Sequence, residues 1–162
     1  MTSQTAPNHT ASDGYDAIVA ARSVLPVLRD TSANSDLQRQ VDDRAISVMR
    51  DAGLARLLTP KEYGGLELPP SAQIRTCMIM AGACSAASWV HMVCGAHTFV
   101  VARFPKECRD EVFSANPDVL LPGTLAPQGT VTRADNGWRL SGRWQFGSGV
   151  DHGPWLLLGA LG

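Results

Sequence analysis

Residues 142–155 read GRWQFGSGVDHGPW and indicate a β-strand that ends in a glycine-rich turn. Aromatic and polar side chains alternate over residues 143–146, a period of two that predicts a strand with one aromatic face. Residues 147–149 leave the backbone almost without side-chain cover, so a flat ligand can approach its amides and the Ser148 hydroxyl. This stretch alone allows two interpretations, a ligand-binding turn or a barrel strand that simply ends at glycine.

The residues just before this stretch predict a β-hairpin. Two short strands, residues 131–134 and 138–140, flank the sequence Asp135, Asn136 and Gly137. An Asn-Gly pair accepts the positive φ angles that tight hairpin turns require, so the turn is expected here.

The residues after the turn continue the β pattern. Asp151, His152 and Trp155 follow at once, and we expect His152 to have a structural or interface role. Residues 155–161 are almost wholly apolar and predict a further strand. Because such a strand without a successor leaves an exposed edge, we expect this sequence to be a fragment, or its missing strands to come from elsewhere.

The pattern before residue 118 is helical. Apolar residues recur at helical spacing over residues 15–28, where Pro26 is expected to end or kink the helix. A second helix is predicted to begin at a cap, Ser35 or Asp36, and to end at Gly53. Its predicted buried face is Leu37, Val41, Ala45 and Met49.

An irregular loop is predicted over residues 54–70, because Pro and Gly-Gly pairs interrupt it repeatedly. Residues 76–102 then lack Asp, Glu, Lys and Arg, which raises the question of a membrane span. Small and polar residues dilute the hydrophobicity, so two buried helices are the better interpretation, one starting near Ser71 and one capped by Ser85. A short helix from Pro105 through Phe113 follows.

The second buried helix carries Trp89 and His97, which are eight residues apart. Eight residues are close to two helical turns, about 12 Å of rise, so the two side chains are expected on roughly the same face. His91 points elsewhere. A histidine within an apolar helix is more often a hydrogen-bonded core residue than a catalyst, so this spacing leaves both roles open.

The composition describes a globular protein that has no nucleic-acid footprint. Of the 162 residues 44% are hydrophobic, the net charge is −1, and Lys and Arg are scattered. Four cysteines lack zinc-ligand spacing and are interpreted as structural thiols of a reducing cytoplasm, with no metal site: Cys77, Cys84, Cys94 and Cys108. Residues 1–14 are polar, without the apolar core of a secretory signal, and are expected to be disordered.

Three strings support a resemblance to a known family. They are GLARLLTPKEYGG (53–65), SWVHMVCGAHTFVVARFPKECRDEVF (88–113) and APQGTVTRADNGWRLSGRWQFGSGVDHGPW (126–155). Together they resemble the acyl-CoA dehydrogenase superfamily, specifically its flavin-dependent monooxygenase branch, the oxygenase components of two-component hydroxylases. The dehydrogenases carry a T-E-P-x-A-G-S-D-like segment and a Thr- or Ser-Asn-Ala turn, where this chain has GTLAPQGTVTRAD and WQFGSGVDH. Both departures favour the hydroxylases.

The resemblance implies an α+β fold. An N-terminal all-helical domain, residues 15–117, is expected to precede an incomplete middle domain, residues 118–162. The latter corresponds to the first part of an antiparallel β-barrel. The family's C-terminal four-helix bundle, which completes the flavin site and a homotetramer, has no counterpart in this sequence.

The resemblance also implies roles for particular residues. Two segments match those that line the flavin in the family: Gly123, Thr124 and Leu125, and Phe146, Gly147 and Ser148. Ser148 is expected near N5 and C4a, where a hydroxyl donor stabilises a C4a-hydroperoxide. His97 resembles the histidine that faces the substrate and favours a phenolate, and Trp89 is expected to wall the same cavity. Family members often carry a second Ser at position 123 or 124, so hydroxyl donation there depends on Thr124.

The implied activity is hydroxylation of an aromatic or polycyclic substrate. The oxygenase takes FADH2 or FMNH2 from a separate NAD(P)H:flavin reductase and uses dioxygen as co-substrate. Two alternatives stay open at this stage. One is an acyl-CoA dehydrogenase whose catalytic glutamate lies outside these residues, and the other is an inactive truncated product that binds no flavin.

Overall fold

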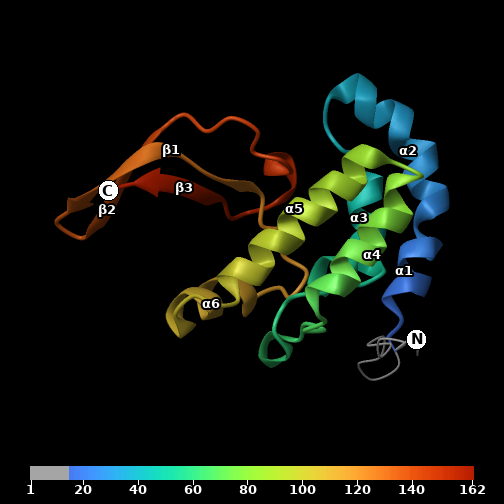
Figure 1. The fold of residues 1–162 in the computed structure, drawn as a ribbon, viewed down its shortest axis with the longest axis horizontal. Coiled ribbons are helices and arrows are strands. Elements are labelled where there is room, and N and C mark those ends of the chain that lie inside the picture. The colour runs from blue at the N-terminus through green and yellow to red at the C-terminus, as the bar shows by residue number, and fades with distance from the viewer. Residues whose placement is uncertain (1–14) are drawn as a thin grey trace, which may run out of the picture.

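The computed structural model describes residues 15–162, so the prediction of a disordered start lies outside the described residues. Helices come first along the chain and strands last, as Figure 1 shows. The elements are α1 (Ala17–Ser23), α2 (Leu25–Gln38), α3 (Asp43–Asp51), η1 (Leu54–Arg56), η2 (Lys61–Tyr63), α4 (Pro70–Ala81), α5 (Ser85–Val101), α6 (Lys106–Phe113), β1 (Gly123–Ala134), β2 (Gly137–Gly142), η3 (Val150–His152) and β3 (Leu157–Leu161). The order of helices then strands confirms the expected α+β class, whereas the domain boundary at residue 118 stays a prediction.

The first predicted helix is divided in two. The break lies at Val24, between α1 and α2, and Pro26 lies in the first turn of α2 instead of ending a helix. Proline is tolerated there because the first-turn amides of a helix have no intrahelical acceptor. Asp16 caps α1 by accepting hydrogen bonds from the amides of the first turn.

The prediction that a helix begins at Ser35 or Asp36 is wrong. Helix α2 runs through these residues to Gln38 and ends at Arg39, whose φ of 56° is left-handed. Helix α3 starts only after Asp42, whose side chain caps it. The break changes the helical phase, so Leu37 is 84% exposed and does not belong to the predicted buried face. The other members of that face, Val41, Ala45 and Met49, are buried, and Gly53 follows the end of α3 with a φ of 74°.

Helices α4 and α5 pack against each other through buried polar contacts. The Gln73 amide on α4 donates to the carbonyl of His91 on α5 at 2.7 Å. Thr76 Oγ1 and His91 Nε2 lie 2.9 Å apart, and both side chains are buried. The predicted start of α4 is confirmed to within one residue. Ser85 is the first residue of α5, and Cys84 holds the cap position without a side-chain bond, so the predicted Ser85 cap is wrong.

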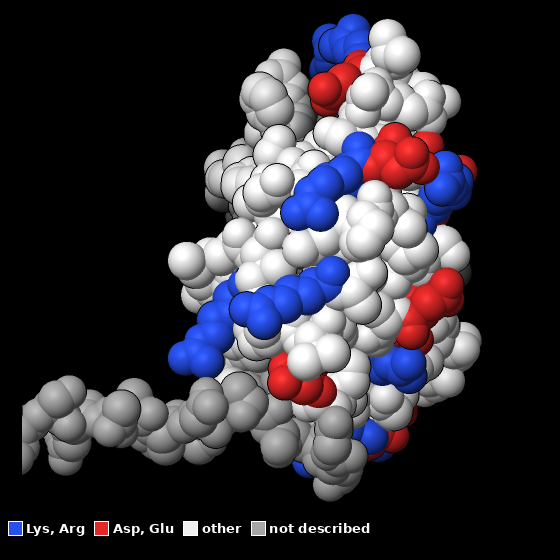
Figure 2. Space-filling view, turned by 90° about the vertical axis from the view of Figure 1, so that its right-hand side faces the viewer, with Lys and Arg blue, Asp and Glu red and all other residues white. Residues whose placement is uncertain are grey.

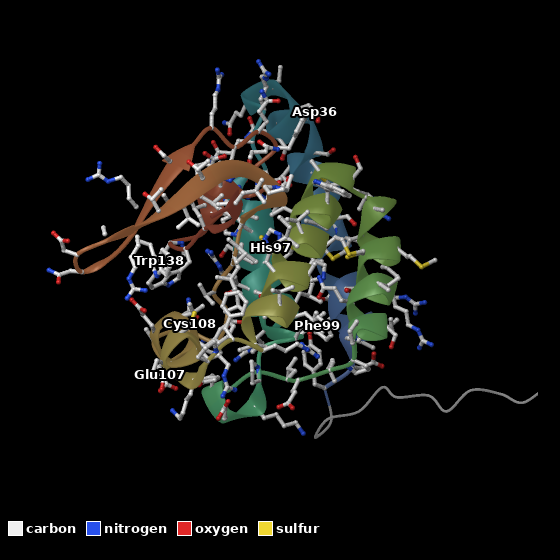
Figure 3. The ribbon with its side chains drawn as sticks, turned by 60° about the vertical axis from the view of Figure 1, so that its left-hand side comes forward. Asp36, His97, Phe99, Glu107, Cys108 and Trp138 are labelled. Carbon is white, nitrogen blue, oxygen red and sulfur yellow. The ribbon has the colours of Figure 1, made fainter. Side chains whose placement is uncertain are left out.

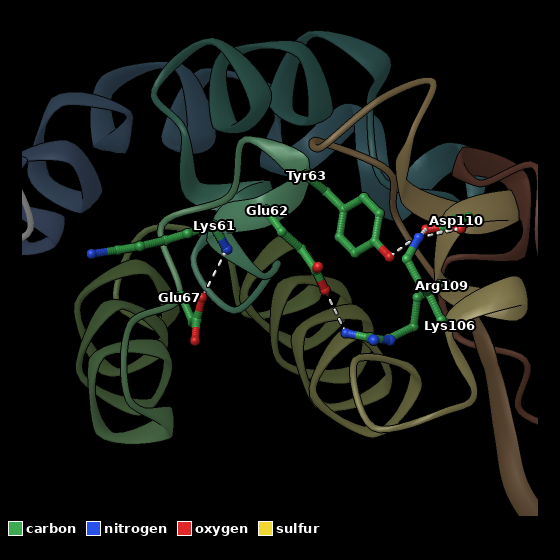
Figure 4. Close-up of polar contacts among 7 residues, drawn as sticks. All are labelled: Lys61, Glu62, Tyr63, Glu67, Lys106, Arg109 and Asp110. Atoms are coloured by element: carbon green, nitrogen blue, oxygen red, sulfur yellow. Dashed lines mark hydrogen bonds and ion pairs between the residues drawn. The ribbon is translucent and has the colours of Figure 1, made fainter.

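Helix α6 is joined to the preceding loop by polar contacts, as Figure 4 shows. Tyr63 Oη in η2 donates to Asp110 at 2.7 Å, and Lys106 pairs with the same carboxylate at 2.6 Å. Arg109 pairs with Glu62. The loop of residues 54–70 is irregular apart from its two 3-10 turns, as predicted, and the contacts of Tyr63 and Glu62 fix it against α6.

The three strands form one open sheet in the order β2-β1-β3. Strands β1 and β2 pair antiparallel and make the predicted hairpin, in which Gly137 has a φ of 148°. Asn136 is not among the residues with positive φ, so that part of the turn prediction is wrong. Strands β1 and β3 pair parallel, so the expectation of antiparallel pairing holds only for the hairpin. The register shifts on both sides of Pro127, which has no amide proton to donate.

The prediction of a strand over residues 143–146 is also wrong. Phe146 has a φ of 59°, which interrupts an extended backbone, and its side chain is 87% exposed. Trp144 turns back over the sheet, where its Nε1 donates to the Gly159 carbonyl at 2.7 Å. Its ring occupies the space beside Gly129, where an added Cβ would lie 2.1 Å from a ring carbon. Trp144 therefore covers β1 instead of extending the sheet, whereas Phe146 is exposed.

Two hydrophobic clusters hold the molecule together. The larger lies among α1–α5, with Leu28, Ala45, Leu57, Met80 and Ala87 fully buried. The smaller contains Val101, Val112, Phe113, Val119 and Leu121, with Leu157 of β3 packed against it. The second cluster therefore joins the end of α5 and α6 to the start of the sheet.

Candidate functional site

The glycine-rich turn faces the amino-terminal part of α5 across a hollow of about 440 Å³. Ala86, Trp89 and Val90 form one side of it, and residues 146–152 form another. The indole Nε1 of Trp89 donates to the Ser148 hydroxyl at 2.9 Å. The structure therefore brings together Trp89, Phe146, Gly147 and Ser148, four of the residues that the sequence singled out.

The backbone around Ser148 is held by two local contacts. Its amide donates to the Phe146 carbonyl at 2.8 Å, and Ser148 also forms an isolated bridge with Gly123. The bridge ties the turn to the start of β1, so the two predicted flavin-lining segments meet here. Gly149 closes onto α5, because a Cβ added to it would lie 3.1 Å from Val90 Cγ1. Its φ of 81° suits glycine, so the turn depends on this residue.

No residue of the first segment, Gly123 included, lines the hollow. Thr124 Oγ1 accepts a long bond of 3.4 Å from the Ala126 amide, and the Leu125 side chain is 54% exposed. Of this segment, only Gly123 is linked directly to the turn.

His97 lies inside the molecule, as Figure 3 shows, and does not line the hollow. Its Nδ1 is 2.7 Å from the Leu121 carbonyl. Because a carbonyl can only accept, Nδ1 carries a proton, and Nε2 is the acceptor of the neutral ring. Burial lowers the pKa of His97, and the bond to the Leu121 carbonyl raises it in part. The imidazole is therefore held neutral, with Nε2 as its acceptor nitrogen.

The far side of the hollow is formed by residues that the sequence did not indicate as part of a site. It consists of residues 35–36 and 39–41, at the end of α2 and in the connection to α3. Figure 3 labels Asp36, which lies near the end of α2. Ser35 Oγ accepts from the Asp42 amide at 3.0 Å, which closes the connection. The sequence pattern placed Arg39 and Gln40 inside one continuous helix, and no motif links them to the turn.

A contact from α3 holds the end of the turn. Arg50 Nη2 donates to the His152 carbonyl at 2.7 Å, and His152 Nδ1 is 3.5 Å from Asp43 Oδ1. The His152 side chain is only 3% exposed. These contacts agree with the expected structural role of His152, and they position residues 150–152 against the helices.

Charges on the described surface are mixed. Figure 2 shows Lys and Arg side chains interspersed with acidic and uncharged ones on one face. Among residues 15–162, no group of three or more His, Cys, Asp and Glu side chains is arranged to hold a metal ion. In that same part of the chain, every helix is too short or too polar to cross a membrane.

Comparison with known proteins gives consistent matches. The family described as "Acyl-CoA dehydrogenase, N-terminal domain" matches residues 17–108. The oxygenase subunit HsaA of a flavin-dependent monooxygenase from Mycobacterium tuberculosis is 28% identical over 147 residues, 91% of this chain and 37% of that protein. The oxygenase component of an FADH2-dependent resorcinol hydroxylase from Rhizobium sp. is 31% identical over 138 residues, 85% of this chain and 34% of that protein.

A solved structure agrees with these relatives. XiaF from Streptomyces sp., in complex with FADH2 and glycerol, superposes with a TM-score of 0.84 at 30% identity, over 88% of this chain and 36% of that one. The chain thus spans about a third of the length of the relatives that it matches, 37% and 34% for the two above. Because residues 17–108 of its 162 match the family, the chain belongs to the acyl-CoA dehydrogenase family, through its N-terminal domain.

Proposed function

We propose that this chain belongs to the oxygenase component of a two-component flavin-dependent monooxygenase that hydroxylates an aromatic or polycyclic substrate. The relatives named above support the reaction class. The observation that carries the proposal is the bond from Trp89 Nε1 to the Ser148 hydroxyl, 2.9 Å long. An indole nitrogen can only donate, so Ser148 accepts in this bond and keeps its own proton for a ligand.

The residues around Ser148 fit the edge of a reduced flavin. A Cβ added to Gly147 would have only Val150 within 4 Å, at 3.9 Å, so the backbone before Ser148 is open to a flat ligand. The Phe146 ring is 87% exposed and available for contact with an aromatic system. The turn therefore offers one hydroxyl donor, an uncovered backbone and an aromatic side chain. We assign flavin contacts to Gly123, Thr124, Leu125, Phe146, Gly147 and Ser148, and a wall to Trp89.

The chemistry assigned to these residues is limited to binding, donation and exclusion of water. A bound reduced flavin supplies the two electrons that activate dioxygen. The Ser148 hydroxyl donates a hydrogen bond to negative charge that develops beside it, and exclusion of water would strengthen this interaction. Gly147, just before Ser148, leaves room for a small co-substrate, because a Cβ added there would meet only Val150, at 3.9 Å. The Trp89 side chain forms part of the α5 side of the hollow.

The family resemblance assigns the proton transfer of the substrate to His97, whose side chain is 4% exposed and lies outside the hollow. With Nδ1 bonded to the Leu121 carbonyl, the neutral ring presents Nε2 as a base. A phenol has a pKa of about 10, so a neutral acceptor within hydrogen-bond reach favours the phenolate, the better nucleophile. The lowered pKa of His97 keeps this acceptor unprotonated near neutral pH.

The proposal includes partners and location. A separate NAD(P)H:flavin reductase supplies FADH2 or FMNH2, and the working assembly is a homotetramer, as the family resemblance implies. The three thiols Cys77, Cys84 and Cys94 are free and buried, which supports a reducing cytoplasm. The chain divides into a helical domain, residues 15–117, and a β domain from residue 118.

The test uses the longest open reading frame that contains this chain. It is titrated anaerobically with FADH2 and FMNH2 and then mixed with a candidate phenol and oxygenated buffer. Tight binding of reduced flavin and oxygen incorporation into the phenol support the proposal. Binding of oxidised FAD only, with bleaching by an acyl-CoA, would instead favour a dehydrogenase.

A further inference from the structure

We propose that Trp89 is a positioning residue, which sets the direction of the Ser148 hydroxyl through its indole N–H. This inference rests on the proposed function and deepens it. The indole nitrogen lies 2.9 Å from Ser148 Oγ although the two residues are 59 positions apart. The Trp89 side chain is 60% exposed, so water could satisfy its N–H, and burial does not force this bond.

The bond removes rotational freedom that a serine otherwise keeps. A serine side chain has three staggered positions, and its hydroxyl proton rotates further. The Ser148 backbone is fixed independently by the Phe146 carbonyl and the Gly123 bridge. Trp89 therefore acts on the one part of Ser148 that the backbone leaves free. Since it occupies an acceptor position of Oγ, the hydroxyl proton points away from the indole.

The support for Trp89 is itself rigid. It lies in the first two turns of α5, where the neighbouring Ala87 and Ser88 are buried. Ser88 Oγ donates to the Cys77 carbonyl at 2.9 Å, which fixes this part of α5 against α4. Val90 touches the turn next to Gly149. The Trp89 donor on α5 and the Ser148 hydroxyl on the turn are therefore both held by backbone that other contacts fix in place.

The expected effect is modest and selective. A hydrogen bond between neutral groups contributes about 1 kcal/mol net, so its loss should reduce the stabilisation provided by Ser148 about five-fold. Trp89→Phe keeps an aromatic ring at this position and removes the N–H donor together with the five-membered ring of the indole. We therefore expect reduced-flavin affinity to change less than about two-fold, while the oxygen-dependent flavin absorbance transient decays about five-fold faster.

The first measurement observes the bond without any reaction. In a protein with 15N-labelled tryptophan, the Trp89 indole resonance should move upfield and lose exchange protection in Ser148→Ala. The matched control is Trp138 on β2, which is 65% exposed and whose resonance should not move. An unchanged Trp89 resonance in Ser148→Ala would overturn the inference.

The second measurement is a double-mutant cycle on the decay of the transient. Trp89→Phe should accelerate decay about five-fold with Ser148 present and have no further effect in Ser148→Ala. Equal acceleration in both backgrounds would show that Trp89 does not act through Ser148, and would refute the inference while leaving the proposed function intact. Trp138→Phe should leave the decay unchanged. If reduced flavin does not bind the wild type, the proposed function fails and this inference with it, even if the resonance shift shows the bond.

Discussion

Gly95→Ala should destabilise the protein although it replaces glycine inside a helix by the best helix former. A Cβ at position 95 would lie 2.4 Å from Gln73 Nε2 and 2.5 Å from Gln73 Cδ. Gln73 is 3% exposed, and its Nε2 donates to the His91 carbonyl at 2.7 Å. The substitution must therefore displace a side chain that is already bonded and enclosed.

The magnitude follows from three contributions. Helix propensity favours alanine by about 1 kcal/mol. Overpacking costs about 1–3 kcal/mol. The lost bond to the His91 carbonyl costs about a further 1 kcal/mol. The net change is a destabilisation of about 2 kcal/mol, which lowers the melting temperature by roughly 4–8 °C for a chain of this size.

Urea denaturation followed by circular dichroism measures this change. Gly82 at the end of α4 is the matched control, since its nearest atom would be the Ile79 carbonyl oxygen at 3.8 Å. Gly82→Ala should therefore be neutral within about 0.5 kcal/mol. In a Gln73→Ala background the space is free, and Gly95→Ala should then stabilise by about 1 kcal/mol. Equal effects of Gly95→Ala in both backgrounds would refute the packing argument.

Three further predictions follow from burial and hydrogen bonding. Burial lowers the pKa of His91 from 6.5 to about 4, so between these pH values the unfolded chain binds a proton that the folded chain excludes. The free energy of unfolding should therefore fall by up to about 3 kcal/mol as the pH drops from about 7 toward 4. In urea titrations, His91→Gln should reduce this dependence of stability on pH. Leu28 is fully buried and Leu37 is 84% exposed. In thermal unfolding, Leu28→Ala should therefore lower the stability by about 2–5 kcal/mol and Leu37→Ala by less than about 0.5 kcal/mol, and equal losses would contradict the exposed position of Leu37. Arg50→Met removes the donor to the His152 carbonyl and should speed amide hydrogen exchange around residues 147–153 about five-fold or more. Unchanged exchange would show that the Arg50 contact does not hold the turn.

Much of the fold could be predicted where one local signal decides the backbone. Gly53 ends α3, Pro105 precedes α6, and the sequence around Gly137 makes a hairpin, because glycine permits a positive φ and proline fixes φ near −65°. The errors arise where a periodic pattern crosses an unrecognised break. Leu37 keeps the four-residue spacing of the buried face, but Arg39 takes a left-handed conformation and starts a new helical phase.

The candidate site was predictable only in part for a similar reason. Trp89 and Ser148 are both visible as candidates in the sequence, and the structure joins them. Phe146 keeps the alternation of a strand, whereas its left-handed backbone ends that alternation and starts the turn. The wall at residues 39–41 is brought in by tertiary packing, which no local pattern encodes.

The most direct test of the account compares wild type and Ser148→Ala in the longest reading frame that contains this chain. Both are loaded anaerobically with FADH2 or FMNH2 and mixed with oxygenated buffer while flavin absorbance is followed. We predict similar binding of reduced flavin by both and a transient that decays about ten-fold or more faster in Ser148→Ala, since the donor to developing charge is lost. A transient of equal lifetime in the two proteins, or no binding of reduced flavin by the wild type, would contradict the account.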